Sequence, residues 1–435
     1  MMKRLLFLMT SVVVLLSGCK DDDSFSSDHS LRLAFSVDTV RVDTVFTTVP
    51  SATYSFWVRN QSGNGIRINS VRLERGNQSG FRANVDGAFV NPVATDLEVR
   101  KGDSLRVFVE LTALENRSEE PHLVEDNLLF LLESGVEQRV NLRAISLDAQ
   151  KMSNLVVNSD MTIESAMPVV FYGEGIKVEE GATLTLRNTK LYFHDGAGLQ
   201  VKGRVVAENC LFRGDRLDHM FDYLPYDRVS GQWAGITIMA RADGCTFTDC
   251  EIRSAYNGIM ADSTSISMTN TIVHNSKGYC LYAHDSEVTL QNCLLSNALN
   301  DCLSLYGCQA IVAHSTLAQF YPFSAARGAA LRFGPSDDYP VKLEFSNTMV
   351  TGYEEDVLMG EERNDETVDY IFQNCLLRTP VVDDADAFDA IIWEKTSDAV
   401  QGTGHFVTID ETNFIYDFQL KEESPCVELG IGWTN

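Results

Sequence analysis

The chain has 435 residues, of which 61 are Asp or Glu and 35 are Lys or Arg, so its formal net charge is −26. Its pI is about 4.6, and a field of this sign repels nucleic acid and other polyanions, with no basic stripe to offset it. We therefore expect no nucleic-acid partner, and an acidic polysaccharide could bind only through Ca²⁺ or a local basic patch.

Residues 1–19 carry the features of a secretory signal. They begin with Met-Met-Lys-Arg, continue as an apolar run from Leu5 to Leu16 and end in Leu-Ser-Gly-Cys19. The apolar run is too short to span a bilayer as a helix. Leu-Ser-Gly-Cys resembles the bacterial lipobox, which implies a diacylated Cys19 as the new N-terminus and anchoring by two or more acyl chains. The alternative is an ordinary signal peptide with an incidental Cys.

Residues 20–30 form a predicted tether. It starts with Lys20-Asp21-Asp22-Asp23 and is Ser-rich to Ser30. This order resembles the Lys-then-acidic signal that sends Bacteroidetes lipoproteins to the cell surface, although a solvated acidic linker would look the same. The resemblance implies an outer membrane lipoprotein exposed at the cell surface, in contact with the membrane through its lipid anchor.

Residues 31–150 show alternating apolar strands, such as 53–58 and 105–109, separated by turn sequences rich in Gly and Asn. Several such strands over about 120 residues predict a β-sandwich. The run Val-Arg-Asn-Gln-Ser at 58–62, followed by Gly80-Phe81, resembles immunoglobulin-like modules of the Hydin type. No catalytic constellation occurs here, so we interpret this region as a spacer or adhesion module.

Residues 151–380 are dominated by a repeated bend of the form x-Asn-[Cys/Thr]-x-aliphatic. The bends are spaced by 21, 40, 21, 22, 22, 33 and 27 residues. Positions −4, −2, +1 and +3 are apolar or small, which indicates a short strand on each side and a change of phase at the bend. Asn tolerates the left-handed conformation that such a bend needs, and stacked amides can form a ladder. The bend residues are Asn188, Asn209, Asp249, Asn270, Asn292, His314, Asn347 and Asn374.

A second short apolar segment, which we call the second apolar pulse, follows about ten residues after each bend. Each repeat is therefore predicted to contain three short strands and no helix. A coil of this kind cannot bury its inner face alone, but stacked coils can. A leucine-rich repeat would place leucines at −5 and −3 from the Asn, where this chain has polar residues such as Glu287 and Thr289. The pattern predicts an all-β chain with a right-handed parallel β-helix of about ten coils.

Three further stretches, 191–203, 212–218 and 231–236, are similar to right-handed β-helix lipoproteins of Bacteroidetes, which are related to the pectate-lyase-like superfamily. This resemblance implies the fold and brings no assigned reaction. Residues 381–435 leave the repeat, and their Ser-Pro-Cys at 424–426 resembles the closing segment of many β-helix proteins. We predict that this segment caps the open end of the helix, where unpaired strand edges would otherwise aggregate.

The ten cysteines include four at the position after the bend, Cys210, Cys250, Cys293 and Cys375. There they would be small buried hydrophobic residues. A zinc site would need paired Cys-x₂-Cys spacing, which is absent. Neighbouring coils lie close enough for disulfides in an oxidising compartment, but we favour free thiols.

Function is expected on the insertions that lengthen the repeat, because the coil interior is filled. The first insertion extends from Arg213 to Trp233 and the second from Gln319 to Pro340. Carboxylates, an imidazole and aromatic rings in one loop could serve acid–base chemistry or stack on sugar rings, or they could simply pair with each other and hold the loop down. The catalytic candidates are Asp215, Arg216, His219, Asp222 and Arg327. The binding candidates are Tyr223, Tyr226, Arg228, Trp233, Tyr321, Phe323 and Arg332.

A third insertion, 352–369, is strongly acidic, so it could bind Ca²⁺ or be solvated. We expect no other metal and no organic cofactor. The Asn-Thr-Asp, Gly-His-Gly and Arg-Ile-Lys signatures of polygalacturonase-type hydrolases are absent. We therefore expect a monomeric surface lipoprotein that binds glycan or another surface partner or has a structural role. The alternative is a polysaccharide lyase or glycoside hydrolase acting in a groove on the β-helix.

Overall fold

The computed structural model describes residues 24–118, 120–221, 223–242, 244–336, 339, 341–361 and 368–435. The predicted signal, Cys19 and the acidic start of the tether lie outside these residues. The chain divides into two compact units. One contains residues 48–115 and 122–146 with the stretch up to Thr44, and the other contains 147–435 with the short segments 45–47 and 116–121.

The first unit contains two antiparallel five-stranded sheets, in agreement with the predicted β-sandwich. Strand faces alternate, so that Phe56 and Val58 are buried while Trp57 between them is 40% exposed. One sheet has the order β1 (Ala34–Phe35), β3 (Tyr54–Arg59), β8 (Ser104–Leu111), β5 (Phe81–Val85) and β6 (Ala88–Phe89). The other has the order β2 (Thr39–Phe46), β10 (Glu137–Leu147), β9 (His122–Leu132), β4 (Ile66–Leu73) and β7 (Val93–Val99).

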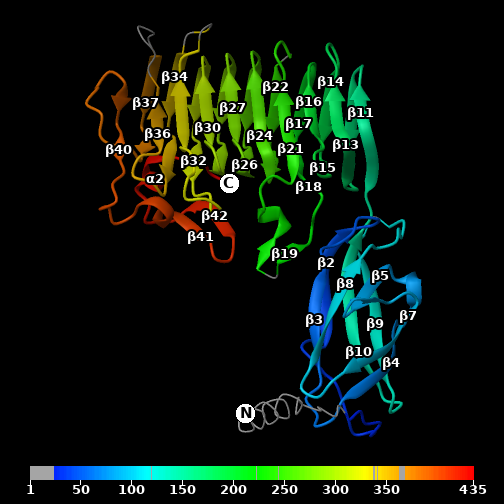
Figure 1. Ribbon diagram of the computed structural model, residues 1–435. Coiled ribbons are helices and arrows are strands. Elements are labelled where there is room, and N and C mark those ends of the chain that lie inside the picture. Colours follow the sequence, from blue (N-terminus) through cyan, green and yellow to red (C-terminus); the bar gives the residue numbers. More distant parts are fainter. Residues whose placement is uncertain are drawn as a thin grey trace, which may run out of the picture. The chain divides into compact units, whose positions relative to one another are not determined.

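The second unit is a parallel β-helix whose coils follow one another in sequence order, as the colours of Figure 1 show. The strand before each bend belongs to a ten-stranded parallel sheet, which we call row A. Row A contains β12 (Met161–Glu164), β14 (Thr183–Arg187), β17 (Arg204–Glu208), β22 (Cys245–Thr248), β25 (Ser265–Thr269), β28 (Glu287–Gln291), β31 (Gln309–Ala313), β34 (Val341–Ser346), β37 (Val368–Gln373) and β39 (Phe388–Asp389).

The other two strands of each coil form row B, after the bend, and row C, at the second apolar pulse. Row B contains β15 (Lys190–Phe193), β18 (Leu211–Gly214), β23 (Glu251–Arg253), β26 (Ile272–Ser276), β29 (Leu294–Ala298), β32 (Thr316–Gln319), β35 (Met349–Gly352), β38 (Leu376–Leu377) and β40 (Ile392–Trp393). Row C contains β16 (Gly198–Val201), β21 (Trp233–Ile238), β24 (Ala255–Asp262), β27 (Leu281–His284), β30 (Leu303–Tyr306), β33 (Leu331–Gly334) and β36 (Leu358–Gly360). The long strands β11 (Gln150–Val157) and β13 (Val169–Val178) open the helix, and β13 pairs with both β15 and β16.

Every predicted bend residue has the left-handed backbone conformation, with φ between +48° at Asn188 and +52° at Asp249. This conformation lets the residues on either side both point inward. In one coil Val288, Leu290, Cys293 and Leu295 are all at most 1% exposed. The nine cysteines of the described residues are buried and free of disulfide bonds. The local bend therefore supports a continuous apolar core along the coils.

The C-terminal segment, which the sequence predicted to cap the open end, adds a coil and then folds back on the coils. Residues 388–393 extend rows A and B by one more coil. The chain then forms the hairpin β41 (Phe406–Asp410) and β42 (Ile415–Leu420) and the helix α2 (Pro425–Leu429). These elements pack on the outer side of row B, where Leu294, Met349 and Leu376 would otherwise expose apolar side chains. The segment thus runs back along the flank of the coils.

Candidate functional site

Asp215 and His194 lie at the ends of two adjacent row B strands. Nδ1 of His194 is 2.7 Å from Oδ2 of Asp215, whose side chain is 4% exposed. Burial raises the pKa of Asp215, and the hydrogen bond from His194 opposes that effect. The imidazole itself is 45% exposed, so a buried carboxylate orients a solvent-facing histidine.

Arg216 is engaged within its own loop. Its Nε and Nη2 donate to the two carboxylate oxygens of Asp218 at 2.8 and 2.6 Å, and its guanidinium lies 4.2 Å from the ring centroid of Tyr226. Asp218 is 1% exposed. The loop is thus held down by ion pairing, with Asp218 as the partner of Arg216.

Two aromatic candidates are buried. Trp233 is 1% exposed, stacks on Phe193 at 4.5 Å and donates from Nε1 to the carbonyl of Arg253. Tyr321 is 4% exposed. Neither ring is available to stack on a sugar, because each is already covered on the inside of the fold. The sequence placed Trp233 in the insertion, whereas it is the first residue of β21 and points into the core.

The first two insertions do contact each other. The hydroxyl of Tyr321 is 2.7 Å from Oγ of Ser230. The C-terminal hairpin joins them, since Phe323 stacks on Phe414 at 5.4 Å and Arg228 lies over the ring of Tyr416. These contacts build a packed cluster of loops.

The remaining candidates are spread over separate places. His219 begins the short hairpin of β19 (His219–Phe221) and β20 (Leu224–Pro225), where the 63% exposed Tyr223 stacks on Phe221. Asp222 lies outside the described residues. Arg327 donates to the carbonyl of Ser324 and lies over the ring of Tyr353. The catalytic candidates therefore have different partners, and no described contact joins Arg327 to Asp215.

Arg332 lies instead on the outer face of row C. Its Nε donates to Oδ2 of Asp301 at 3.0 Å, and its Nη1 is 3.4 Å from Oε1 of Glu361. The hydroxyl of Tyr306 donates to the same Glu361 oxygen at 2.9 Å. Desolvation, together with that carboxylate, raises the pKa of Tyr306, so the phenol stays a neutral donor at physiological pH. Arg332, Glu361 and Tyr306 form one connected polar group.

Two adjoining grooves cover the outer face of row C. One has a volume of about 640 Å³ and is bordered by Glu174, Lys177, Asp195 and Gln200. The other has a volume of about 590 Å³ and is bordered by Met260, Asp262, Tyr282 and His284. Thr237 lines both grooves, so together they follow the stacking direction of the coils. We call this continuous feature the row C groove.

An aromatic group extends the row C groove toward Arg332. The ring of Tyr282 lies 5.1 Å from Tyr279 and 6.1 Å from Tyr306. Strand pairing aligns Tyr282 with Ser304 and Ser304 with Arg332, and the small, buried Ser304 leaves room above it for these larger side chains. Parallel strands thus place aromatic and charged groups of three successive coils on one face.

Of these row C residues, the sequence analysis singled out only Arg332, as a binding candidate in an insertion. The sequence analysis looked for functional residues in the insertions. The informative residues were instead those at the outward-facing position of each row C strand. That position holds Lys177, Gln200, Thr237, Met260, Tyr282, Ser304, Arg332 and Met359 in successive coils.

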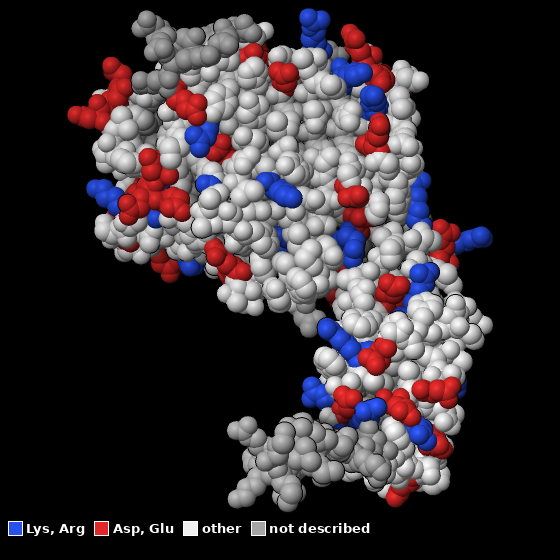
Figure 2. Space-filling model, in the orientation of Figure 1, with Lys and Arg blue, Asp and Glu red and all other residues white. Residues whose placement is uncertain are grey.

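Charge over the described residues is mixed. On the face in Figure 2, basic side chains are scattered among acidic ones.

Within the part of the chain that the structure describes, no three His, Cys, Asp or Glu residues are grouped as metal ligands would be. Residues 362–367 of the acidic loop 352–369, which was considered for Ca²⁺, lie outside that part. None of the described helices is long and apolar enough to cross a bilayer.

Three comparisons with solved structures give only weak likeness. The chain is similar to the N-terminal domain of PorA (19% identity, 26% of this chain and 97% of that chain, TM-score 0.20) and to the ASH/PapD-like domain of human CEP192 (10%, 31% and 97%, TM-score 0.20). It is also similar to the Vibrio cholerae VesB protease (15%, 28% of this chain, TM-score 0.20), of which it spans about a third, 33%. Similarity at this level carries no argument about activity.

Comparison with curated proteins gave no significant match. A family model described as the right handed beta helix region matches residues 145–317. This match agrees with the stacked coils and gives the hand of the helix. The predicted all-β fold, antiparallel sheets followed by a right-handed parallel β-helix, is confirmed.

Proposed function

We propose that the protein is a glycan-binding surface lipoprotein whose β-helix binds a polysaccharide along the row C groove. The observation that carries this proposal is the continuity of the two grooves through Thr237, with Tyr282 at one end. Long, open grooves with aromatic rings and a few fixed polar groups suit an extended sugar chain, because the rings stack on the apolar faces of sugars while the polar groups bind hydroxyls.

The charges around the row C groove favour a neutral glycan over a polyuronate. Lys177, His284 and Arg332 are each accompanied by acidic neighbours, and Arg332 is already paired with Asp301. A net charge of −26 also opposes a polyanion. Hydroxyl groups need no such compensation, since carboxylates, amides and the Tyr306 phenol can all bond to them.

The test is binding of purified protein to a panel of neutral polysaccharides. Tyr282→Ala removes a stacking ring and should weaken binding roughly tenfold. Tyr223→Ala is the matched control, since it removes an exposed tyrosine from the β19–β20 hairpin and should leave affinity unchanged. Equal affinity of wild type and Tyr282→Ala would reject the row C groove. A loss confined to Tyr223→Ala would move the site to the insertion.

Anchoring is part of the same proposal. Acylation of Cys19 would hold the β-sandwich and β-helix at the outer membrane, and the lipobox-like Leu-Ser-Gly-Cys supports it. Cys19→Ala should abolish incorporation of labelled palmitate and release the protein from membranes. Protease accessibility on intact cells tests surface exposure, and protection from protease would place the protein on the inner leaflet.

A second candidate function is polysaccharide lyase activity, and the His194–Asp215 pair favours it. His194 directly precedes Asp195, which borders the row C groove. Nε2 of the imidazole would take the proton from C5, the carbon next to a uronate carboxylate. The bond from C4 to the leaving oxygen then breaks, a C4–C5 double bond forms, and the leaving oxygen takes a proton from water or from the imidazolium. Absorbance of the unsaturated product, lost in His194→Ala, would establish this activity. Absence of the product across a panel of uronate polysaccharides would remove it.

A further inference from the structure

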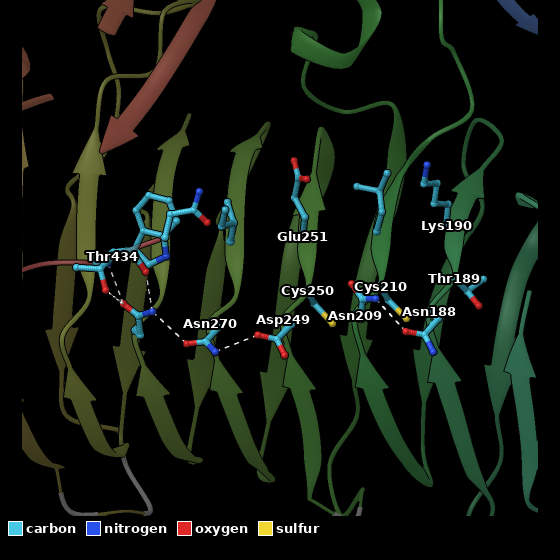
Figure 3. Close-up of a pocket in the computed structure, with 15 residues that line it drawn as sticks. Asn188, Thr189, Lys190, Asn209, Cys210, Asp249, Cys250, Glu251, Asn270 and Thr434 are labelled. Atoms are coloured by element: carbon cyan, nitrogen blue, oxygen red, sulfur yellow. Dashed lines mark hydrogen bonds between the residues drawn. The ribbon is translucent and has the colours of Figure 1, made fainter. Parts of the chain in front are cut away.

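A different face of the β-helix carries a second groove, along the bend residues. It has a volume of about 600 Å³ and is bordered by Asn188, Asn209, Asp249 and Asn270. It ends at Trp433, Thr434 and Asn435 of the C-terminal segment (Figure 3). The groove is thus the open continuation of a path that the chain's own C-terminal segment already occupies.

The C-terminal segment pairs with the ladder through its main chain. Asn292 donates from Nδ2 to the carbonyl of Thr434 at 2.8 Å, and its Oδ1 accepts from the N–H of Thr434 at 2.9 Å. Asn374 donates to the carbonyl of Leu429 at 3.1 Å. A bend Asn therefore bonds both the N–H and the C=O of one residue, as a residue of a neighbouring β-strand would.

This pairing at Asn292 depends on the residue in the next coil. Along the ladder, Asn209, Asn270, Asn292 and Asn374 each donate to Oδ1 of the preceding bend residue, as Asn292 does to Asn270 at 3.0 Å. The bend residue of the next coil is His314, which donates no hydrogen bond to Oδ1 of Asn292 in the described structure. Oδ1 of Asn292 is therefore left for the N–H of Thr434.

The same situation recurs at Asn209. Its Nδ2 donates to Asn188 at 2.9 Å, but the next bend residue is Asp249, whose carboxylate has no N–H to give. Figure 3 shows bonds between Asn209 and Asn188 and between Asn270 and Asp249, with none from Asp249 to Asn209. Within the described chain, Oδ1 of Asn209 has no donor, and its second Nδ2 proton is also unused.

Row B forms one side of this groove, and several of its outward-facing side chains are apolar. The position two residues after each bend faces outward on row B. Under the C-terminal segment it holds Leu294, Met349 and Leu376, packed against Ile431 and Trp433. In the open part it holds the half-buried Leu211, between Lys190 and Glu251, whereas Ile272 in the next coil already packs against the cluster that contains Trp433. An extended segment could therefore place an apolar side chain there as Trp433 does.

We propose that the open part of this groove binds an extended peptide segment of a partner protein. The main-chain N–H and C=O of one residue pair with Asn209 as those of Thr434 pair with Asn292, and an apolar side chain packs on Leu211. The four open coils span about 15 Å, which corresponds to about four or five extended residues. This inference does not depend on glycan binding, since it concerns another row of the β-helix.

The probe is a fluorescein-labelled peptide with the sequence Leu-Gly-Ile-Gly-Trp-Thr-Asn, that of residues 429–435, titrated with the purified protein and followed by fluorescence polarisation. Asp249→Asn is the decisive variant, because the new amide would donate to Oδ1 of Asn209 and complete the ladder. Binding should weaken about tenfold while thermal stability is maintained or increased. N-methylation of the peptide's Thr nitrogen should cause a similar loss.

Asp262→Asn is the matched control, since it removes the same charge from the row C groove. It should leave peptide affinity unchanged. Equal affinity of the wild type and Asp249→Asn, an equal loss in Asp262→Asn, or no saturable binding of the peptide would each overturn the proposal. Binding of an oligosaccharide that Asp249→Asn abolishes would assign the groove to a sugar instead and would also overturn it.

Discussion

Arg378 and Glu394 form a buried ion pair that ties the C-terminal segment to the coils. Nη1 of Arg378 is 3.1 Å from Oε1 of Glu394, and the two side chains are 4% and 1% exposed. Oε2 of Glu394 also accepts from Oγ1 of Thr351 at 2.7 Å, and the backbone N–H of Gly402 donates to Oε1. The last row B strands and the segment after them thus share one buried carboxylate.

Neutralising this carboxylate should destabilise the β-helix. Glu394→Gln leaves the guanidinium of Arg378 buried without a countercharge, which is expected to lower the free energy of unfolding by about 3 kcal/mol. Urea unfolding followed by circular dichroism measures the change. Glu423→Gln, at an exposed position, is the control and should have little effect. Equal stability of the two variants would contradict a structural role for the pair.

The same residue should contribute to acid sensitivity. Burial acts to raise the pKa of Glu394, but hydrogen bonds with His405, Gly402 and Thr351 lower it below the ordinary value. A depressed folded-state pKa gives stability that is fully present above the unfolded pKa of about 4.3 and is lost as pH falls through the folded value. The melting temperature should therefore drop below about pH 4 in the wild type, and Glu394→Gln should reduce that drop.

The bend conformation predicts a difference between two substitutions of Asn270, whose φ is +48°. Glycine adopts this conformation freely, so Asn270→Gly should lose only the ladder hydrogen bonds, about 1 kcal/mol. Valine is strained there, so Asn270→Val should cost about 2 kcal/mol more. Thermal unfolding of both variants gives the comparison, and equal losses would show that the amide contacts matter more than the backbone.

Trp233 should behave as a core residue. It stacks on Phe193 and is 1% exposed, so Trp233→Ala is expected to lower the free energy of unfolding by about 4 kcal/mol through the cavity it leaves. Trp233→Phe should cost clearly less. Chemical denaturation of both variants checks this. Full stability of Trp233→Ala, together with altered ligand binding, would instead support the role first expected from its place in the insertion.

The buried thiols should be unreactive in the folded protein. Burial raises the pKa of Cys293 to about 11, and its side chain is fully buried. Neither thiolate nor access is then available near pH 8. A thiol reagent that absorbs on reaction should label Cys293 only after unfolding. Rapid labelling of this residue in native protein, identified by mass spectrometry, would contradict the packing described for the coil interior.

Much of the fold follows from local pattern. The alternation around Val288 and Leu290, with the change of phase at Asn292, gave the strands, the inward faces and the parallel β-helix. The candidate site was harder to predict from the sequence than the fold. Tyr282, Ser304 and Arg332 are separated by more than 20 residues along the chain, and only strand pairing aligns them on one face. A search for grouped polar residues in the insertions therefore found Arg332 but missed Tyr282 and Ser304, which lie beside it.

By itself the sequence determined the repeat, because each bend and its apolar positions are a local requirement met within one coil. It also determined the left-handed bends, since Asn, Asp and His tolerate that backbone where β-branched residues do not. Only the tertiary structure decided the distant partners: His194 for Asp215, and Thr434 for Asn292, which lies 142 residues away. The physical reason is that such contacts depend on how coils and segments stack in space, which no local periodicity encodes.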